Sequence, residues 1–272
     1  MQLDEKKLPL VSVIMGTHNG EKYISRCIDS ILSQTYQNWE FIICDDCSSD
    51  DTYSIIKRYS EQDARIKCIK NEKNQGLAFS LNECLKTSNG TYIARMDDDD
   101  ISLPERFKIQ VDFLNNHMEY ALVSSNIVVF DEQTDYGIRT FEELPDLNYL
   151  IGHNPFCHPA IMCRKTTFDI LNGYNPNCKR AQDYELWFRF FYKGFKGYNI
   201  QTPLLKYHES IEDYKKRTLK KALNAFRIGW LGCNLNRVPL YKRVPIFRGI
   251  VSAMVPNIFI DFYHKKLLQE KK

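Results

Sequence analysis

The stretch Thr91-Tyr-Ile-Ala-Arg-Met-Asp-Asp-Asp-Asp-Ile-Ser-Leu-Pro104 joins an apolar run to four consecutive carboxylates. The apolar part predicts a buried strand, and the carboxylates would then lie at the rim of a sheet. Clustered carboxylates supply the hard oxygen ligands that Mg²⁺ or Mn²⁺ prefers. The run therefore predicts a divalent-metal site. The alternative is a solvated loop that caps the next helix.

Apolar strand-like runs and helical periodicities alternate on both sides of this stretch. The expected strands cover residues 10–15, 39–44, 66–69 and 91–96. A helix is expected after each of them, with apolar inner faces from Ile24, Leu77 and Phe107, and with Asp50 or Asp51 as the cap of a helix that runs to about Tyr59. Regular alternation of this kind predicts an α/β fold with a mostly parallel sheet flanked by helices.

Polar clusters follow three of the four expected strands. They are Gly16-Thr-His-Asn-Gly20, Asp45-Asp46 and Asp97–Asp100. Ligands of parallel sheets bind beyond the carboxyl ends of the strands, so the three clusters predict one shared site. Asp45 could accept a hydrogen bond from a uracil N–H or a ribose hydroxyl, although an adenine dinucleotide site would also favour an acid there. Asp46 is expected to order the loop.

The second half of the chain is less regular. Strands are expected over residues 120–130 and 159–164, and a helix over residues 182–192. The aromatic residues of that helix are interpreted as core rather than as a platform for a sugar. A binding role is expected for His158, and Arg95 and Arg106 could each contact a ligand or anchor a neighbouring carboxylate.

Composition indicates a globular chain, with 272 residues of which 43% are hydrophobic and 26% charged. Residues 1–7 show no apolar leader, so no signal peptide is expected, and no apolar stretch reaches the roughly 18 residues of a membrane span. The nine cysteines predict reduced thiols in a cytoplasmic protein. The spacing Cys44-x-x-Cys47 is interpreted as incidental.

Charge is distributed unevenly. Residues 214–272 carry 14 Lys and Arg against 2 Asp and Glu, whereas residues 1–213 carry 23 against 32. A basic tail with interleaved apolar and aromatic residues predicts a peripheral contact with the anionic inner face of the cell membrane. The alternative is that the tail packs on the body of the protein or on a second subunit. Nucleic-acid binding is disfavoured, because the acidic body would repel phosphate backbones.

At this point the sequence resembles the inverting family 2 glycosyltransferases with the GT-A fold. The resemblance covers roughly residues 9–210 and is specific as a combination. Its motifs are residues 11–19, residues 42–52, Asn74-Gln-Gly-Leu77, Asn89–Arg106 and Gln182-Asp-Tyr-Glu-Leu-Trp187. It implies a GT-A catalytic domain over residues 1–210, with a nucleotide-binding half (1–115), an acceptor half (116–210) and a basic, amphipathic helical tail (211–272).

The resemblance also implies roles for individual residues. Asp97-x-Asp99 matches the family's D-x-D motif, so Asp99 would bind Mn²⁺ or Mg²⁺, and Asp97 would face the ribose and the metal's water shell. Asp98 is a further candidate near the donor, although it falls outside the motif. The other donor-binding candidates are Thr17, His18, Asn19, Glu21 and Asp45. His208 is a candidate third metal ligand.

Asp183 lies where the family has its catalytic base. The usual Glu-Asp pair reads Gln182-Asp183 here, which removes the acidic neighbour but keeps the base. The implied reaction moves a sugar from a nucleotide-diphospho-sugar, expected to be a UDP-sugar, to a hydroxyl of a glycan or lipid-linked acceptor with inversion.

Two further functions stay open from the residues alone. A nucleotidyltransferase can share the architecture, but the loop at residues 16–20 has no Lys or Arg. A non-catalytic nucleotide-sugar-binding subunit would keep the acidic site and would be unaffected by loss of Asp183. A NAD-dependent oxidoreductase is disfavoured because G-x-G-x-x-G is absent.

Overall fold

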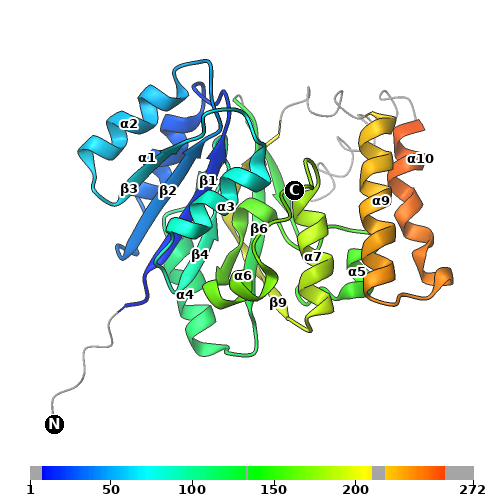
Figure 1. The fold of residues 1–272 in the computed structure, drawn as a ribbon. Coiled ribbons are helices and arrows are strands. Elements are labelled where there is room, and N and C mark those ends of the chain that lie inside the picture. The colour runs from blue at the N-terminus through cyan, green and yellow to red at the C-terminus, as the bar shows by residue number, and fades with distance from the viewer. Residues whose placement is uncertain (1–7, 133, 210–217, 255–272) are drawn as a thin grey trace, which may run out of the picture.

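The computed structural model describes residues 8–132, 134–209 and 218–254, and in it one twisted sheet lies between two groups of helices (Figure 1). The strands are β1 (Val11–Thr17), β2 (Trp39–Asp45), β3 (Ile66–Lys70), β4 (Tyr92–Arg95), β5 (Ile101–Ser102), β6 (Leu122–Phe130), β7 (Asp135–Arg139), β8 (Met162–Arg164) and β9 (Gly197–His208). The α-helices are α1 (Ile24–Leu32), α2 (Thr52–Gln62), α3 (Leu77–Thr87), α4 (Arg106–Asn116), α5 (Leu147–Leu150), α6 (Lys165–Leu171), α7 (Gln182–Tyr192), α9 (Leu219–Leu235) and α10 (Arg248–Met254). Short 3-10 helices are η1 (His158–Ala160) and η2 (Leu240–Phe247).

The first half of the sheet is parallel, as predicted. Strands run in the order β3-β2-β1-β4, and the expected bounds of all four are correct to within two residues. In register, Thr17 lies beside Asp45, so the ends of β1 and β2 present their side chains at the same rim. The α/β prediction is therefore confirmed for the part of the chain that carries the rim clusters.

The second half is mixed. β8 joins β4 and β6 by antiparallel pairing, β6 and β9 are parallel, and β5 and β7 add antiparallel edges. The expected strand at residues 159–164 divides into η1 and the shorter β8, because Pro159 has no backbone N–H to donate to a sheet. The parallel β6–β9 pair brings His208 beside Phe130, which are far apart in the sequence.

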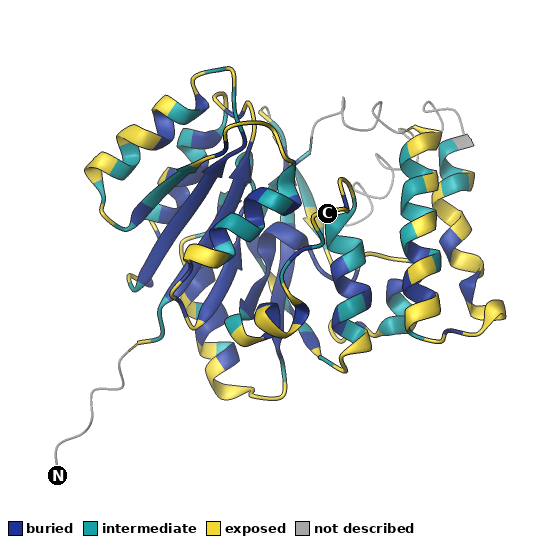
Figure 2. Ribbon diagram, in the orientation of Figure 1, coloured by how far each residue is buried: buried dark blue, intermediate teal, exposed yellow. Residues whose placement is uncertain are grey.

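Alternate residues of the central strands pack into two hydrophobic cores, one on each face of the sheet. In β1, Val11, Val13 and Met15 pack with α1, α2 and α4, whereas Ile14 packs with α3, α6 and α7. Strands β1, β2 and β4 are buried along their whole length, as the dark-blue centre of Figure 2 shows. Burial on both faces explains why their sequences are mostly apolar, with Ser12 in β1 and Glu40 in β2 as buried polar exceptions.

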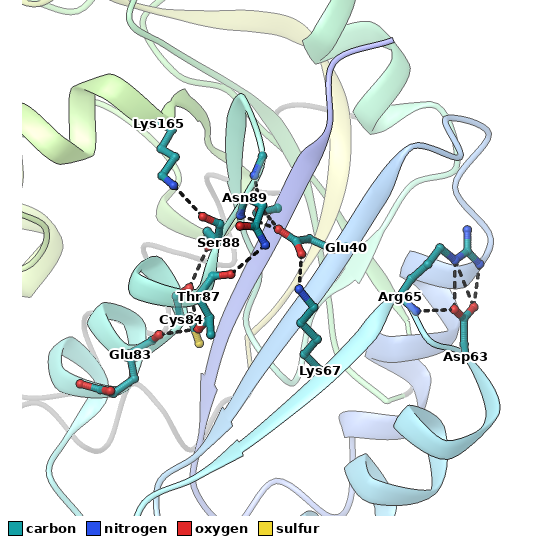
Figure 3. Close-up of polar contacts among 12 residues, drawn as sticks. Glu40, Asp63, Arg65, Lys67, Glu83, Cys84, Thr87, Ser88, Asn89 and Lys165 are labelled. Carbon is teal, nitrogen blue, oxygen red and sulfur yellow. Dashed lines mark hydrogen bonds and ion pairs between the residues drawn. The ribbon is translucent and has the colours of Figure 1, made fainter. Parts of the chain in front are cut away.

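A charged group anchors the opposite, N-terminal ends of the central strands (Figure 3). The buried carboxylate of Glu40 accepts from the Ser12 hydroxyl at 2.6 Å, from the Asn89 backbone N–H at 2.7 Å and from the Lys67 ammonium at 2.6 Å. Burial raises the pKa of this carboxyl, and the bonds from Lys67, Ser12 and Asn89 outweigh it, so the net shift is downward. These contacts tie β1, β2, β3 and the turn before β4 together, far from the polar rim.

The C-terminal helices pack against α7 at its outer side (Figure 1). α9 approaches α7 closely through Gly229, which faces Tyr184, and Gly232, which faces the ring of Phe188. Pro245 lies within η2, which separates α9 from α10, so the prediction that prolines interrupt the tail is met there. Pro256 and the other parts of the expected tail at residues 211–217 and 255–272 lie outside the described residues, as do residues 1–7.

Gly232→Ala is expected to lower the free energy of unfolding by about 1–3 kcal/mol. A Cβ built at Gly232 would lie 2.2 Å from Cγ of the buried Phe188 ring, so the helices would have to separate. Thermal unfolding measures the loss. Gly249→Ala in α10 is the matched control, because its Cβ would meet nothing within 4 Å and alanine favours a helix. Equal melting temperatures for the two variants would contradict the close α7–α9 contact.

All nine cysteines are free thiols, as the sequence predicted. Among the residues that the structure describes, no helix has the length and apolar character needed to cross a bilayer.

Candidate active site

The rim formed by β1, β2 and β4 brings the predicted acidic residues together. Asp45 at the end of β2 is fully buried, and its Oδ2 accepts from the Ser48 backbone N–H at 3.2 Å. Its Oδ1 has no hydrogen-bond partner, which leaves an acceptor for a ligand at this edge. Asp46 orders the loop, as predicted, by accepting from the Asn71 side chain and from the backbone N–H groups of Gln75 and Gly76.

The loop after β1 contacts the loop after β2 through its polar side chains. Asn19, in a left-handed conformation, accepts from the Ser49 N–H at 2.9 Å, and Glu21 accepts from the Asp51 N–H at 3.0 Å. His18 contacts the Asp46 carbonyl at 3.0 Å and is exposed. These three predicted donor residues thus lie at the rim, and Asn19 and Glu21 also hold the two loops together.

The acidic run at residues 97–100 divides into distinct environments. Asp97 forms an ion pair with Arg95, and Asp98 accepts from the hydroxyl of Thr17. Asp100 is fully buried and accepts from the His208 backbone N–H at 2.8 Å, so it anchors the end of β9. Burial raises the pKa of Asp98 to about 7, with the neighbouring charges of Asp99 and Asp97 adding to the rise and Thr17 opposing it. Burial and the same two charges also raise the pKa of Asp100.

His208 lies beside the acidic run, as its predicted role requires. Its Nδ1 is 3.4 Å from a carboxylate oxygen of Asp99, and its Nε2 is 3.5 Å from Glu132. The imidazole ring is buried between Tyr23, at 4.8 Å between ring centroids, and Phe130, at 5.5 Å. In the described parts of the chain, no three His, Cys, Asp and Glu side chains converge to form a metal cluster.

Sequence reasoning missed several residues of this cluster. Glu132 accepts from Tyr23, and Arg26 donates to the Asp99 carbonyl at 3.0 Å while lying 4.9 Å from the centre of the Phe130 ring. The helical period placed Arg26 on the polar side of α1, but no signal in the sequence related it to residue 99. Glu132 follows β6 and belongs to none of the sequence motifs.

Arg95 lies beneath the site. Its guanidinium is 1% exposed and pairs with Asp97 through Nη1, and its Nε has no hydrogen-bond partner among the residues that the structure describes. Its positive charge therefore opposes the negative charge of the acidic run within the protein interior. Arg106 is also buried, but its guanidinium donates to the carbonyls of Arg95 and Ile161 and not to a carboxylate.

His158 is a core residue. It is 7% exposed, and its Nε2 lies 2.8 Å from the Tyr174 hydroxyl. Burial, followed by the nearby Arg95 charge, lowers the pKa of His158 well below its usual value, so the ring is neutral. These contacts favour a role in the core over the binding role that the sequence predicted.

Asp183 lies in the first turn of α7, where the sequence predicted the base. Its Oδ2 accepts from the Asn154 amide at 3.3 Å, and the side chain keeps a partly exposed surface. Desolvation by the surrounding protein raises the pKa of its carboxyl, against the opposing effects of the Tyr184 N–H, Asn154 and Arg95. A carboxylate with a raised pKa, next to open space, can accept a proton from a hydroxyl group.

A parallel first half of the sheet, an acidic rim and a separate carboxylate on α7 agree with the GT-A fold of a glycosyltransferase. The family model "Glycosyl transferase family 2" matches residues 12–178, which is more than half of the chain. The chain belongs to this family and is a glycosyltransferase.

Named relatives and solved structures agree with this assignment. EpsE of Bacillus subtilis (strain 168), named as a glycosyltransferase, is 40% identical over 97% of this chain and 96% of its own. The Escherichia coli UDP-Glc:alpha-D-GlcNAc-diphosphoundecaprenol beta-1,3-glucosyltransferase WfaP is 35% identical over 71% of this chain and 74% of its own. S. aureus TarS 1–349 in complex with UDP superposes with a TM-score of 0.67 at 20% identity, over 90% of this chain and 70% of TarS. A Pyrobaculum calidifontis mannosyltransferase in complex with GDP-Man and Mn²⁺ superposes with a TM-score of 0.62 at 16% identity, over 96% of this chain and 81% of the mannosyltransferase. At these identities the two structures establish the fold alone.

Proposed function

We propose that this glycosyltransferase moves a sugar from a nucleotide-diphospho-sugar to an acceptor hydroxyl with inversion, in a metal-dependent reaction. The donor is a UDP-sugar, as the WfaP name and the TarS complex suggest for related proteins. The observation that carries the proposal is the arrangement of two carboxylate centres. Asp45 and Asp97–Asp99 lie at one sheet rim, and Asp183 lies in the first turn of α7, where the charge of Arg95, the ion-pair partner of Asp97, reaches it.

The donor is held by the nucleotide half, residues 1–115. The unpartnered Oδ1 of Asp45 accepts from the uracil N–H or a ribose hydroxyl. Thr17, His18, Asn19 and Glu21 line the loop next to it, and Asp97 and Asp98 lie where the ribose and diphosphate enter.

The residues present fit a divalent cation. Burial raises the pKa of Asp98 and Asp100, and the charges of Asp97 and Asp99 add to the rise, so a bound cation would oppose this concentration of negative charge. Asp99 and His208 would hold the ion, and the oxygen-rich donor set suits Mn²⁺ or Mg²⁺. When bound, the ion would stabilise the charge of the departing nucleoside diphosphate.

Asp183 acts as the base. It takes the proton from the acceptor hydroxyl, whose oxygen then attacks the anomeric carbon from the face opposite the leaving group. The Asn154 amide holds the carboxylate in place, and the positive charge of the buried Arg95 moderates its pKa. Attack from the opposite face inverts the anomeric centre.

Thermal stabilisation by nucleotides tests the donor class. UDP, GDP, dTDP and NAD are compared with and without Mn²⁺. We expect UDP with Mn²⁺ to raise the melting temperature, with a gain of about 2.7 kcal/mol at a hundredfold excess over its Kd. Stabilisation by NAD instead, or by none of the four, would contradict the proposal.

The C-terminal segment is proposed to contact the anionic inner face of the cell membrane. Leu240, Tyr241, Val244, Phe247 and Val251 are all at least 45% exposed, and the tail is strongly basic. Apolar and basic residues together suit a bilayer surface. Packing of the same face against a second copy is the alternative. Equal sedimentation with phosphatidylglycerol vesicles after removal of residues 240–272 would exclude the membrane role.

A further inference from the structure

A cavity of about 520 Å³ lies between α9, α10 and the loop at residues 151–154. Its volume is within the range of small-molecule sites. α9 and α10 run side by side there (Figure 1), and their facing surfaces are built from small residues. The small side chains that line the cavity are Ala222 and Ala225 on α9 and Gly249 and Ala253 on α10. Figure 2 shows exposed residues on the outer sides of both helices.

The cavity combines positive charge with an apolar wall. Lys221 and Arg248 line it, together with the imidazole of His153, whose Nε2 lies 3.2 Å from an Arg248 nitrogen. Among the described residues that line it, none is Asp or Glu. Ile151, Phe226 and Ile246 add larger apolar surfaces. A ligand that complements this lining has an anionic head and an aliphatic chain.

The cavity lies next to the proposed base, which two of its lining residues adjoin. Asn154 lines it and donates to Asp183 at 3.3 Å, and Tyr184, the next residue of α7, lines it too. An acceptor whose hydroxyl reaches Asp183 therefore has its next groups at Asn154 and His153, and then at the two cations.

We propose that this cavity binds the lipid phosphate of the acceptor, with the phosphate on Lys221 and Arg248 and the chain between α9 and α10. The proposal rests on the proposed function, because it takes Asp183 as the base. It selects a lipid-linked acceptor over a free glycan and gives the C-terminal helices a role in substrate binding.

A second cavity, of about 810 Å³, lies on the other side of α9 and supplies the control. Lys220 and Arg227 line that cavity and not the first one. Replacing them removes the same charge from α9 alone, whereas Arg248 of the test pair lies on α10 and Lys221 lies on α9, where it lines both cavities. Glu185 and Arg189 also line it and form an ion pair, so its electrostatic character differs.

The experiment measures binding of farnesyl diphosphate to the full chain by calorimetry, with UDP and Mn²⁺ present to occupy the donor site. Inorganic diphosphate and farnesol are measured in parallel. We expect farnesyl diphosphate to bind at least about tenfold more tightly than either, because head and chain both contribute. Lys221→Ala with Arg248→Ala should weaken it by about 10- to 100-fold, and Lys220→Ala with Arg227→Ala by less than about twofold.

The outcomes separate the alternatives. Equal weakening in both double variants, or equal affinity for inorganic diphosphate, would overturn the cavity as a lipid-phosphate site. Binding to phosphatidylglycerol vesicles without any cavity-dependent binding of farnesyl diphosphate would replace it with adsorption to a membrane surface. Ala225→Phe narrows the cavity without changing its charge, so it should weaken the binding of farnesyl diphosphate and leave the binding of inorganic diphosphate unchanged.

The test is independent of the proposed function. Failure of UDP to stabilise the wild-type chain would overturn the donor assignment and the acceptor role, whereas cavity-dependent binding of farnesyl diphosphate would still support a lipid-phosphate site. Retained UDP stabilisation in Lys221→Ala with Arg248→Ala shows that any loss of farnesyl diphosphate binding is local.

Discussion

Asp183→Asn is expected to lower kcat by about 10³-fold while leaving donor binding within a few-fold of wild type. The amide keeps the size of the side chain and can still contact Asn154, but it cannot accept the proton of the acceptor hydroxyl. Donor contacts lie on the strands β1, β2 and β4 and are untouched. Steady-state transfer and UDP-dependent stabilisation, measured on the same preparation, separate the two effects.

Glu185→Gln is the matched control for this substitution. Glu185 lies on the same helix, forms an ion pair with Arg189, and is proposed to have no part in the chemistry. Its loss should cost no more than about 1 kcal/mol of stability and leave kcat nearly unchanged. A variant Asp183→Asn with full activity would exclude Asp183 as the base and favour a non-catalytic, nucleotide-sugar-binding role.

The pH dependence follows from the same carboxyl. Because burial raises the pKa of Asp183, the base is protonated and inactive at low pH, and activity should rise as pH passes upward through the raised value. A raised carboxyl pKa also means that ionisation costs stability in the folded state, so stability from this group falls as pH rises. Asp183→Asn should therefore melt at or above the wild-type temperature at neutral pH, and should lose the acid limb of the rate profile.

Asp99→Ala is expected to abolish Mn²⁺-dependent stabilisation by UDP and to lower kcat/KM by at least about 100-fold. Even residues that only support a metal ligand cost 10- to 100-fold when removed, and Asp99 is proposed to bind the ion directly. Its carboxylate lies 3.4 Å from His208, so the variant would leave the imidazole as a lone ligand. Thermal shifts with and without Mn²⁺ measure the first effect, and transfer kinetics the second.

The folded state of Asp99→Ala should not be weakened. Asp99 raises the pKa of the buried Asp98 and Asp100 through charge repulsion, so its removal relieves that repulsion. Asp112→Ala on α4, an exposed carboxylate away from the rim, is the control and should match wild type in both assays. Metal-dependent UDP binding that survives in Asp99→Ala would show that residues 97–100 are not the metal site.

The sequence alone predicted the parallel first half of the sheet and the location of its rim. β1, β2 and β4 are buried on both faces, so each is mostly apolar, and a cluster of polar residues follows where each strand ends. The helix over residues 182–192 was predicted with its observed bounds, because its aromatic residues follow the helical period and one face of it is core. These features depend on neighbours in the chain, which is why they can be read from it.

Only the tertiary structure decided which distant residues share the site. The parallel β6–β9 pair and the antiparallel β5–β9 pair bring His208 and Glu132 to Asp99 and Asp100, and no local pattern encodes that register. The packing of α9 on α7 likewise depends on two glycines whose role is visible only when Phe188 and Tyr184 face them. Strand pairing and helix contact are set by burial summed over the whole chain, so the residues that they bring together leave no signature in any one segment.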